Sequence, residues 1–158
     1  MENLIESLKK LVTSLNSYIV TQGPKLTPDT SIKTMQKEQL LVAMCAAIQE
    51  HEGWYPGSCS FRNRNPGNLK YAVQKKAIGK DDKGFARFAT YEDGLQSLEN
   101  MILNAARGNS SVYKSTMTLL QFFQKYAPSS DNNNPLRYAE VVAKRMGVPV
   151  NFTINGLA

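Results

Sequence analysis

The sequence predicts an α+β fold that is predominantly helical and carries a small β-hairpin. Segments 35–52, 90–107, 116–127 and 135–147 combine helical apolar spacing or capping residues with Gly or Pro stop signals. Segment 69–89 alternates in character around the Asp-Asp-Lys-Gly turn signal at 81–84, which is typical of a hairpin. With 158 residues, the chain has room for one domain with a real core and is short for a two-domain enzyme.

The first expected element is an amphipathic helix over residues 3–20. Its apolar residues recur mainly at three- and four-residue steps: Leu4, Ile5, Leu8, Leu11, Val12, Leu15 and Ile19. Segment 23–30 has two prolines and a glycine and is interpreted as a linker. We therefore expect residues 1–33 to be a helix and linker, and 34–158 to be the main domain. The apolar stripe is expected to dock on that domain or to self-associate, with a membrane surface as the third alternative.

Within the main domain, the second helix is expected from about Met35 to Glu52, where Gly53 discourages continuation. A loop to Asn68 follows, and then the hairpin, with strands at 69–73 and 85–88. Three further helices complete the domain. Their expected boundary residues are Thr90 and Gly108, Thr116 and Pro128, and Pro135 and Gly147.

The net charge of +6 resides in one segment. Residues 62–87 hold eight basic side chains against Asp81 and Asp82, whereas the charges elsewhere cancel. Such a segment either attracts a polyanion or is a solvated loop. Nucleic acid is not the predicted partner, because no recognised binding module accompanies the charge.

The sequence shows neither a membrane-spanning segment nor a signal peptide. The longest apolar run, 40–48, has nine residues, far below the roughly 18 to 20 of a membrane span. The acidic N-terminus does not resemble a signal peptide, so we expect a protein made and left in a cytoplasm.

Cys45 is expected to be buried and Cys59 to lie in a loop. Both are expected to be reduced, since two cysteines cannot make a disulfide framework or a four-cysteine zinc site.

Glu52 is the candidate general acid. It continues the apolar face of Leu41, Met44 and Ile48, whereas Glu50 lies about 200° away around the helix. A carboxyl group at the end of an apolar face is partly desolvated, which favours the neutral form that donates a proton. The competing interpretation is a helix-end glutamate tilted into water.

Several catalytic classes are excluded by their missing residues. His51 and Glu52 begin like the zinc-protease pattern H-E-x-x-H, but Tyr55 stands in the last position and the chain has no other histidine. There is no phosphate-binding lysine loop, dinucleotide glycine fingerprint or nucleophile elbow. We therefore predict no metal and no cofactor.

The motifs that remain are Glu52-Gly53, the stretch from Arg62 to Tyr71 with Asn-Pro-Gly-Asn at 65–68, and the stretch 84–94. In this order they resemble the lysozyme-like peptidoglycan-cleaving domains of bacteriophage endolysins and virion-associated lysins, relatives of lytic transglycosylases and goose-type lysozymes. The resemblance covers about residues 36–147. It implies a lysozyme-like fold for the catalytic domain at 34–158.

The resemblance also implies roles for single residues. Glu52 matches the catalytic acid, and Tyr138 matches the tyrosine that faces this acid in lytic transglycosylases. Tyr126-Ala127-Pro128 looks similar as well, which makes Tyr126 a candidate substrate-binding residue. Arg64 stands where asparagine is usual, and Pro-Leu-Arg precedes Tyr138 in place of small polar residues.

Four other side chains are candidates for sugar binding from their chemistry. The amides of Asn65 and Asn68 either lock the Pro-Gly turn between them or bind sugar hydroxyl and acetamido groups. Trp54 and Tyr71 offer flat faces suited to pyranose rings, and core packing is the alternative for both.

The resulting hypothesis is cleavage of the β-1,4 bond between N-acetylmuramic acid and N-acetylglucosamine in peptidoglycan. No second carboxylate is evident among Asp81, Asp82, Glu92 and Asp93, so lytic transglycosylation is favoured over hydrolysis by a muramidase. The alternative from another class is a non-catalytic glycan-binding protein of a phage particle. The expected location is a phage virion or the host cytoplasm, with action on the cell wall.

Overall fold

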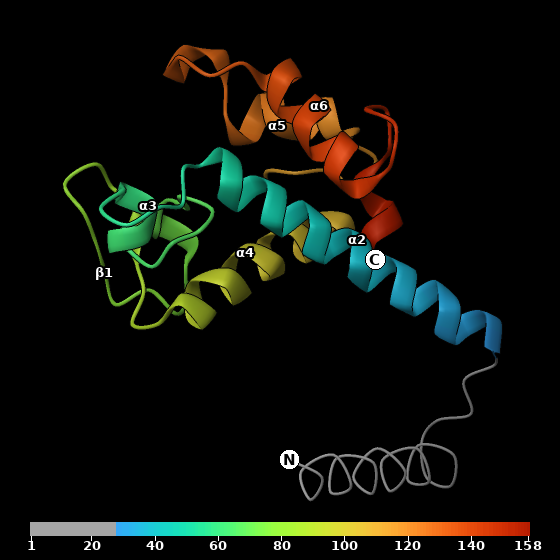
Figure 1. The fold of residues 1–158 in the computed structure, drawn as a ribbon, viewed down its shortest axis with the longest axis horizontal. Coiled ribbons are helices and arrows are strands. Elements are labelled where there is room, and N and C mark those ends of the chain that lie inside the picture. The colour runs from blue at the N-terminus through green and yellow to red at the C-terminus, as the bar shows by residue number, and fades with distance from the viewer. Residues whose placement is uncertain (1–27) are drawn as a thin grey trace, which may run out of the picture. The chain divides into compact units, whose positions relative to one another are not determined.

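The computed structural model describes residues 28–158, and the core and the site lie within 37–158. The described chain is predominantly helical with one two-stranded antiparallel sheet, which confirms the predicted α+β class (Figure 1). The longer helices are α2 (Pro28–His51), α4 (Tyr91–Ala106), α5 (Leu119–Tyr126) and α6 (Pro135–Met146). The helix predicted over 3–20 lies outside the described residues. None of the described helices combines the length and apolar character that crossing a membrane requires.

Helix α2 begins earlier than the sequence predicted. Its first residue is Pro28 rather than Met35, so the interpretation of 28–30 as linker was wrong. Proline lacks only a backbone N–H that the first helical turn leaves unpaired anyway, and therefore Pro28 is compatible with a helix start. At the other end, the N–H of Glu52 still donates to the carbonyl of Ile48, at 2.8 Å.

One hydrophobic core joins the four longer helices and the final turn η3 (Ile154–Leu157). In the view of Figure 1, α5 and α6 lie above the C-terminal half of α2, and α4 lies below it. The large apolar and aromatic side chains that are fully buried between them are Met44, Ile48, Leu98, Ile102, Leu119, Phe122, Phe123, Tyr138, Val142 and Ile154. Cys45 is buried here as predicted, and both cysteines are free.

Side-chain caps define where three of these helices begin. Thr90 accepts from the N–H of Asp93, as predicted for α4. The predicted cap of α5, Thr116, was wrong: Thr118 caps this helix, because Gln121 stands three residues later and completes a reciprocal capping box. The Asn134 side chain caps α6. As predicted, this helix begins at Pro135 and closes at Gly147, which follows its last residue in the left-handed region.

The predicted hairpin is present, but its first strand was misplaced. The strands are β1 (Gly79–Lys80) and β2 (Ala86–Arg87), with Gly79 opposite Arg87. The segment predicted as a strand instead forms the 3₁₀ turn η1 (Tyr71–Val73) after a single bridge between Lys70 and Phe85. Within this segment Leu69 is buried, and its carbonyl accepts from the N–H of Ala86 at 2.8 Å, whereas Tyr71 is exposed.

A short helix lies within the predicted loop and connects this loop to the hairpin. Helix α3 (Cys59–Arg62) follows α2, capped by the Ser58 side chain. Cys59 is partly buried and donates to Asp81 at the hairpin turn, with 3.2 Å between Sγ and Oδ2. Asn63 donates to the same carboxylate oxygen at 2.7 Å. These contacts tie the loop after α2 to the hairpin.

Candidate active site

Glu52 and Glu50 lie in different surroundings, as the helical spacing predicted. Glu50 has a side chain that is 76% exposed, and it lies 3.5 Å from Arg145 of α6. Glu52 is partly buried and contacts residues from two other parts of the chain. Of these two glutamates, Glu52 is therefore the one whose surroundings can hold the carboxyl group in one orientation.

Both carboxylate oxygens of Glu52 accept a hydrogen bond from a side chain. The Tyr138 hydroxyl donates to Oε1 at 2.8 Å, and the Asn68 Nδ2 donates to Oε2 at 2.9 Å. Tyr138 comes from α6 and Asn68 from the Asn-Pro-Gly-Asn loop, so two independent elements fix the carboxyl group. Three residues singled out in the sequence therefore lie together.

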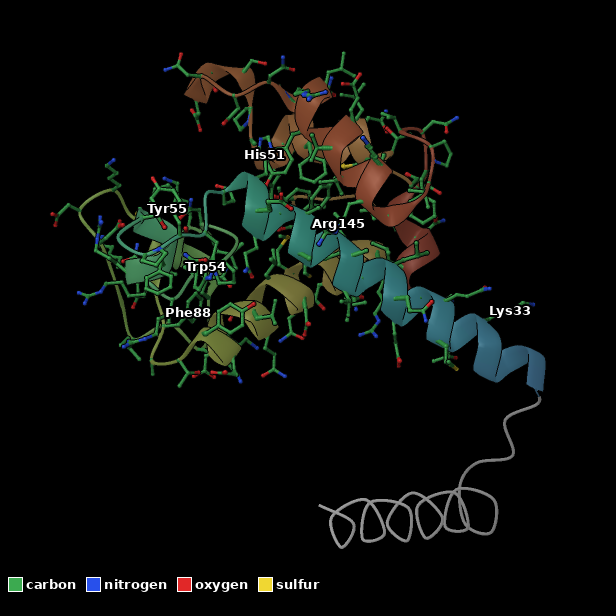
Figure 2. All side chains as sticks on the ribbon, viewed as in Figure 1. Lys33, His51, Trp54, Tyr55, Phe88 and Arg145 are labelled. Atoms are coloured by element: carbon green, nitrogen blue, oxygen red, sulfur yellow. The ribbon has the colours of Figure 1, made fainter. Side chains whose placement is uncertain are left out.

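Tyr138 is held between two rings. Its own ring stacks on His51 with a centroid separation of 3.7 Å, and on Phe123 at 4.2 Å. Burial raises the pKa of its hydroxyl well above the ordinary value, and the nearby groups Tyr126 and Glu52 add to this effect. The phenol therefore stays protonated and acts as a donor. His51 supports this ring. Figure 2 shows His51 at the C-terminal end of α2, where it is exposed.

Asn65 locks the loop, which was one of its two predicted roles. Its Nδ2 donates to the carbonyls of Leu69 and Ala86, both at 2.9 Å, and its Oδ1 accepts from the N–H of Leu69 at 2.9 Å. The side chain is fully buried, so all three bonds form away from water. Asn65 is therefore a positioning residue for the segment that carries Asn68.

Asn68 has the other role, that of a group within the site. Its backbone has φ of +44°, in the left-handed region that asparagine tolerates better than most residues. With Nδ2 bonded to Glu52, its buried Oδ1 has no partner among the described residues. A buried acceptor without a partner is costly, so a bond from any N–H or O–H group that reaches this oxygen would be favourable.

Tyr126 braces the same loop. Its hydroxyl donates to the carbonyl of Gly67. A side chain at Gly67 has no room, because an added Cβ would lie 2.9 Å from this hydroxyl oxygen and 2.8 Å from Leu98. Burial raises the pKa of Tyr126 well above its usual value, with the charge of Glu52 as a further cause. The tyrosine remains a neutral donor.

These residues open onto a groove of about 450 Å³, here called the Glu52 groove. Glu52, Asn68 and Tyr126 line it, together with Lys70, Lys125 and Asp131. Its apolar lining residues are Leu69, Phe85, Met101, Val112, Tyr113 and Ala127. Lys70 is fixed over the Phe85 ring at 3.9 Å from the centroid. The groove combines apolar surface with a few oriented polar groups, as ligand sites commonly do.

Two of the predicted sugar platforms lie elsewhere. Trp54 lines a different hollow of about 430 Å³ between α2 and α4, where its ring packs 5.2 Å from that of Phe61 and 5.1 Å from that of Tyr91. Figure 2 shows Trp54 and His51 at separate places around the C-terminal end of α2. Tyr71 lies in η1, is 42% exposed, and is not among the residues that line the Glu52 groove.

The four acids considered as second carboxylates also lie outside the groove lining. Asp81 is bonded within the hairpin turn and Asp93 at the start of α4. Sequence reasoning missed Asp131, which lines the groove from the 3₁₀ turn η2 (Ser129–Asp131). Its sequence context is an ordinary polar loop between α5 and α6, and no local signal reports that these two helices pack together or that the loop lines the groove.

The comparisons with known proteins return no relative. No family model, curated protein or solved structure matches the chain. Within the described part of the chain, no three histidine, cysteine, aspartate or glutamate side chains form a group that could hold a metal ion. The chemical interpretation of the site therefore depends on the geometry around Glu52.

Proposed function

We propose that this chain is a lysozyme-like peptidoglycan-degrading glycosidase that cleaves the β-1,4 bond between N-acetylmuramic acid and N-acetylglucosamine. Its partner is then the glycan strand of the cell wall, reached from a phage virion or from the host cytoplasm. The observation that carries the proposal is one partly buried carboxyl group, Glu52, oriented by Tyr138 and Asn68 at the edge of a groove.

The groove has the chemistry that an acetamido sugar requires. The free Oδ1 of Asn68 is an acceptor for a hydroxyl or acetamido N–H group. Apolar groups such as Met101 and Val112 offer contact to the faces of sugar rings. In the reaction, Glu52 in its protonated form donates to the glycosidic oxygen as positive charge develops on the muramyl carbon. Tyr138 and Asn68 hold that carboxyl group in place before and after the proton leaves.

For the second half of the reaction we favour lytic transglycosylation. The 6-hydroxyl of the muramyl residue attacks its own anomeric carbon, and the Glu52 carboxylate takes the hydroxyl proton. The products are a 1,6-anhydromuramyl end and a free 4-hydroxyl, no water is consumed, and Glu52 is again protonated. A muramidase would add water instead, and Asp131 in the groove lining is the observation that keeps this alternative open.

Digestion of purified peptidoglycan followed by mass spectrometry of the products tests the proposal. We expect 1,6-anhydro ends from the wild type, loss of activity in Glu52→Gln, and full activity in Glu50→Gln. The second variant is a matched control, because Glu50 precedes Glu52 by two residues but lies at Arg145. Reducing ends would select the muramidase alternative. Cleavage by Glu52→Gln, or glycan binding without turnover by the wild type, would refute the catalytic assignment.

A further inference from the structure

A second hollow, here called the amide hollow, adjoins the Glu52 groove, and four of its twelve lining residues carry side-chain amides: Gln74, Asn100, Asn104 and Asn109. It has a volume of about 420 Å³ and shares four lining residues with the groove: Gln74, Met101, Val112 and Tyr113. Its other wall is the exposed face of α4 at Asn100 and Asn104. A substituent of a sugar held in the groove can therefore enter the hollow without leaving the protein surface.

The polar side chains around this amide hollow are largely without partners. No hydrogen bond or ion pair within the described chain engages the side chains of Gln74, Lys75, Asn100, Asn104 and Asn109. Asn100 and Asn104 are four residues apart on α4 and so point from one face. These amides can donate to and accept from peptide groups, which themselves carry one donor and one acceptor each.

The charge of the amide hollow is positive. Lys75 and Lys76 line it, and no carboxylate does. Lys76 is already engaged, because its Nζ lies 3.1 Å from Asp93 Oδ1 and also donates to Gln96. Lys75 is exposed and has no acidic partner in the part of the chain that is described, so its ammonium group is available to an anion. A carboxylate is the ligand that complements this arrangement.

We propose that the amide hollow binds the carboxylate-bearing peptide stem of the muramyl residue held in the Glu52 groove, with Lys75 as the specificity-determining cation. This inference rests on the proposed function, because the muramyl residue is the sugar of peptidoglycan that carries a peptide. The stem supplies a partner for both kinds of side chain in the hollow: peptide groups for the amides and carboxylates for Lys75. A neutral chitin-type glycan supplies no carboxylate.

Calorimetric titration with a soluble muropeptide, N-acetylglucosaminyl-N-acetylmuramyl-tripeptide, tests this inference. The compound lacks the scissile bond and is not consumed. We expect Lys75→Gln to weaken its binding about five- to tenfold, the usual order for a charge-assisted hydrogen bond at a partly exposed site. The same variant should bind chitobiose, a disaccharide with neither stem nor carboxylate, and the muropeptide with its stem carboxylates amidated, as the wild type does.

Lys80→Gln is the matched control, because it removes an equal charge from β1 of the same basic segment. It should leave all three affinities unchanged. Equal weakening by both variants would show a general field and overturn the inference, and so would unchanged binding in Lys75→Gln. As an independent measurement, the side-chain amide resonances of Asn100 and Asn104 should shift with the muropeptide and not with chitotetraose. Stem-selective binding without peptidoglycan cleavage would refute the proposed function and leave this site standing.

Discussion

At the scale of single residues, Tyr138 combines a packing role and a polar role that one substitution separates. Tyr138→Phe keeps the ring between His51 and Phe123 and removes the hydroxyl that donates to Glu52. We expect kcat on peptidoglycan to fall about tenfold to a hundredfold. A positioned general acid accelerates the reaction by roughly 10² to 10⁴, and the loss of one bond that positions it should cost part of that factor. KM should change little, because Tyr138 is buried behind the carboxyl group.

Thermal unfolding of the same variant provides the control. Loss of one buried hydrogen bond should lower the free energy of unfolding by about 1 to 3 kcal/mol and leave the protein folded at room temperature. Full activity of Tyr138→Phe would contradict the role of its hydroxyl. Loss of activity that merely follows unfolding would assign Tyr138 to the core alone.

Asn65 and Asn68 are expected to differ sharply when each is truncated. Asn65→Ala removes three buried hydrogen bonds and leaves the Ala86 carbonyl and the Leu69 N–H without the Asn65 side chain, while the Leu69 carbonyl keeps its bond from the N–H of Ala86. We expect the free energy of unfolding to fall by about 2 to 4 kcal/mol. Asn68→Ala removes one bond to Glu52 and an acceptor in the groove, and should reduce cleavage with little loss of stability. Denaturant titration and glycan cleavage measure the two effects. The reverse pattern would exchange their roles.

The kinds of side chain that form the site could be predicted from the sequence better than the role of each residue. The helical step separated Glu52 from Glu50 correctly, because position on a helix face follows from spacing alone. Which asparagine faces the carboxyl group depends on loop backbone angles that spacing does not determine. The Trp54 ring was a plausible contact for a sugar from its chemistry. Its position, however, depends on packing against the rings of Phe61 and Tyr91, which no local sequence signal reports.

At the scale of elements, α4 lies so close to the loop that carries Asn68 that position 94 has no room for a side chain. A Cβ on Gly94 would lie 1.9 Å from the backbone oxygen of Arg64. Because that neighbour is backbone rather than a flexible side chain, Gly94→Ala should lower the free energy of unfolding by about 2 kcal/mol or more and displace the loop that carries Asn68. Gly79→Ala is the control, since a Cβ there meets nothing within 4 Å. Equal stability of both variants in denaturant titration would contradict this close contact.

The hairpin turn is expected to lose stability in acid through Asp81. Partial desolvation tends to raise the pKa of this carboxyl group, but hydrogen bonds from Asn63, the Phe85 N–H, Cys59 and the Lys83 N–H hold it lower, at about 2. A folded-state pKa below the unfolded value near 4 means that the ionised group stabilises the fold above about pH 4. This contribution is lost as the pH falls from about 4 toward 2.

Asp81→Asn tests this linkage. The difference in unfolding midpoint between the wild type and this variant should be largest at pH 6 and should shrink as the pH approaches 2. Asp82→Asn is the matched control, because the Asp82 carboxylate lies in the same turn and accepts no hydrogen bond from the described residues. A difference that does not depend on pH would show that geometry, rather than ionisation, sets the effect of Asp81.

Elements with strong local signals were predicted more accurately than the hairpin. Helix α6 begins at a proline and is followed by a glycine because both residues match the backbone angles of those positions. The strands β1 and β2 have two residues each, too few for an alternating pattern to identify. In the same way, α3 has four residues and depends on the Ser58 cap and on contacts with the distant Asp81.

At the scale of the whole molecule, the question is whether the charge of the basic segment is general or local. The net charge is +6, and residues 62–87 carry the excess. In the described structure Lys80, Lys83 and Arg87 are exposed around the hairpin, and none forms an ion pair with the described acids. A local cluster attracts a polyanion more strongly than the same charges dispersed over a surface, and salt screens this attraction.

We therefore expect the triple variant Lys80→Gln, Lys83→Gln, Arg87→Gln to sediment less with purified cell walls at low salt. Its difference from the wild type should vanish toward 1 M salt, where the Debye length is about 3 Å. The control removes three exposed charges elsewhere, in Lys114→Gln, Arg137→Gln, Lys144→Gln, and keeps the hairpin cluster intact. Equal losses in both triple variants would assign the effect to net charge. A loss confined to the hairpin variant, with unchanged turnover of soluble fragments, would make the basic segment a surface that holds the wall polymer while the Glu52 groove works on it.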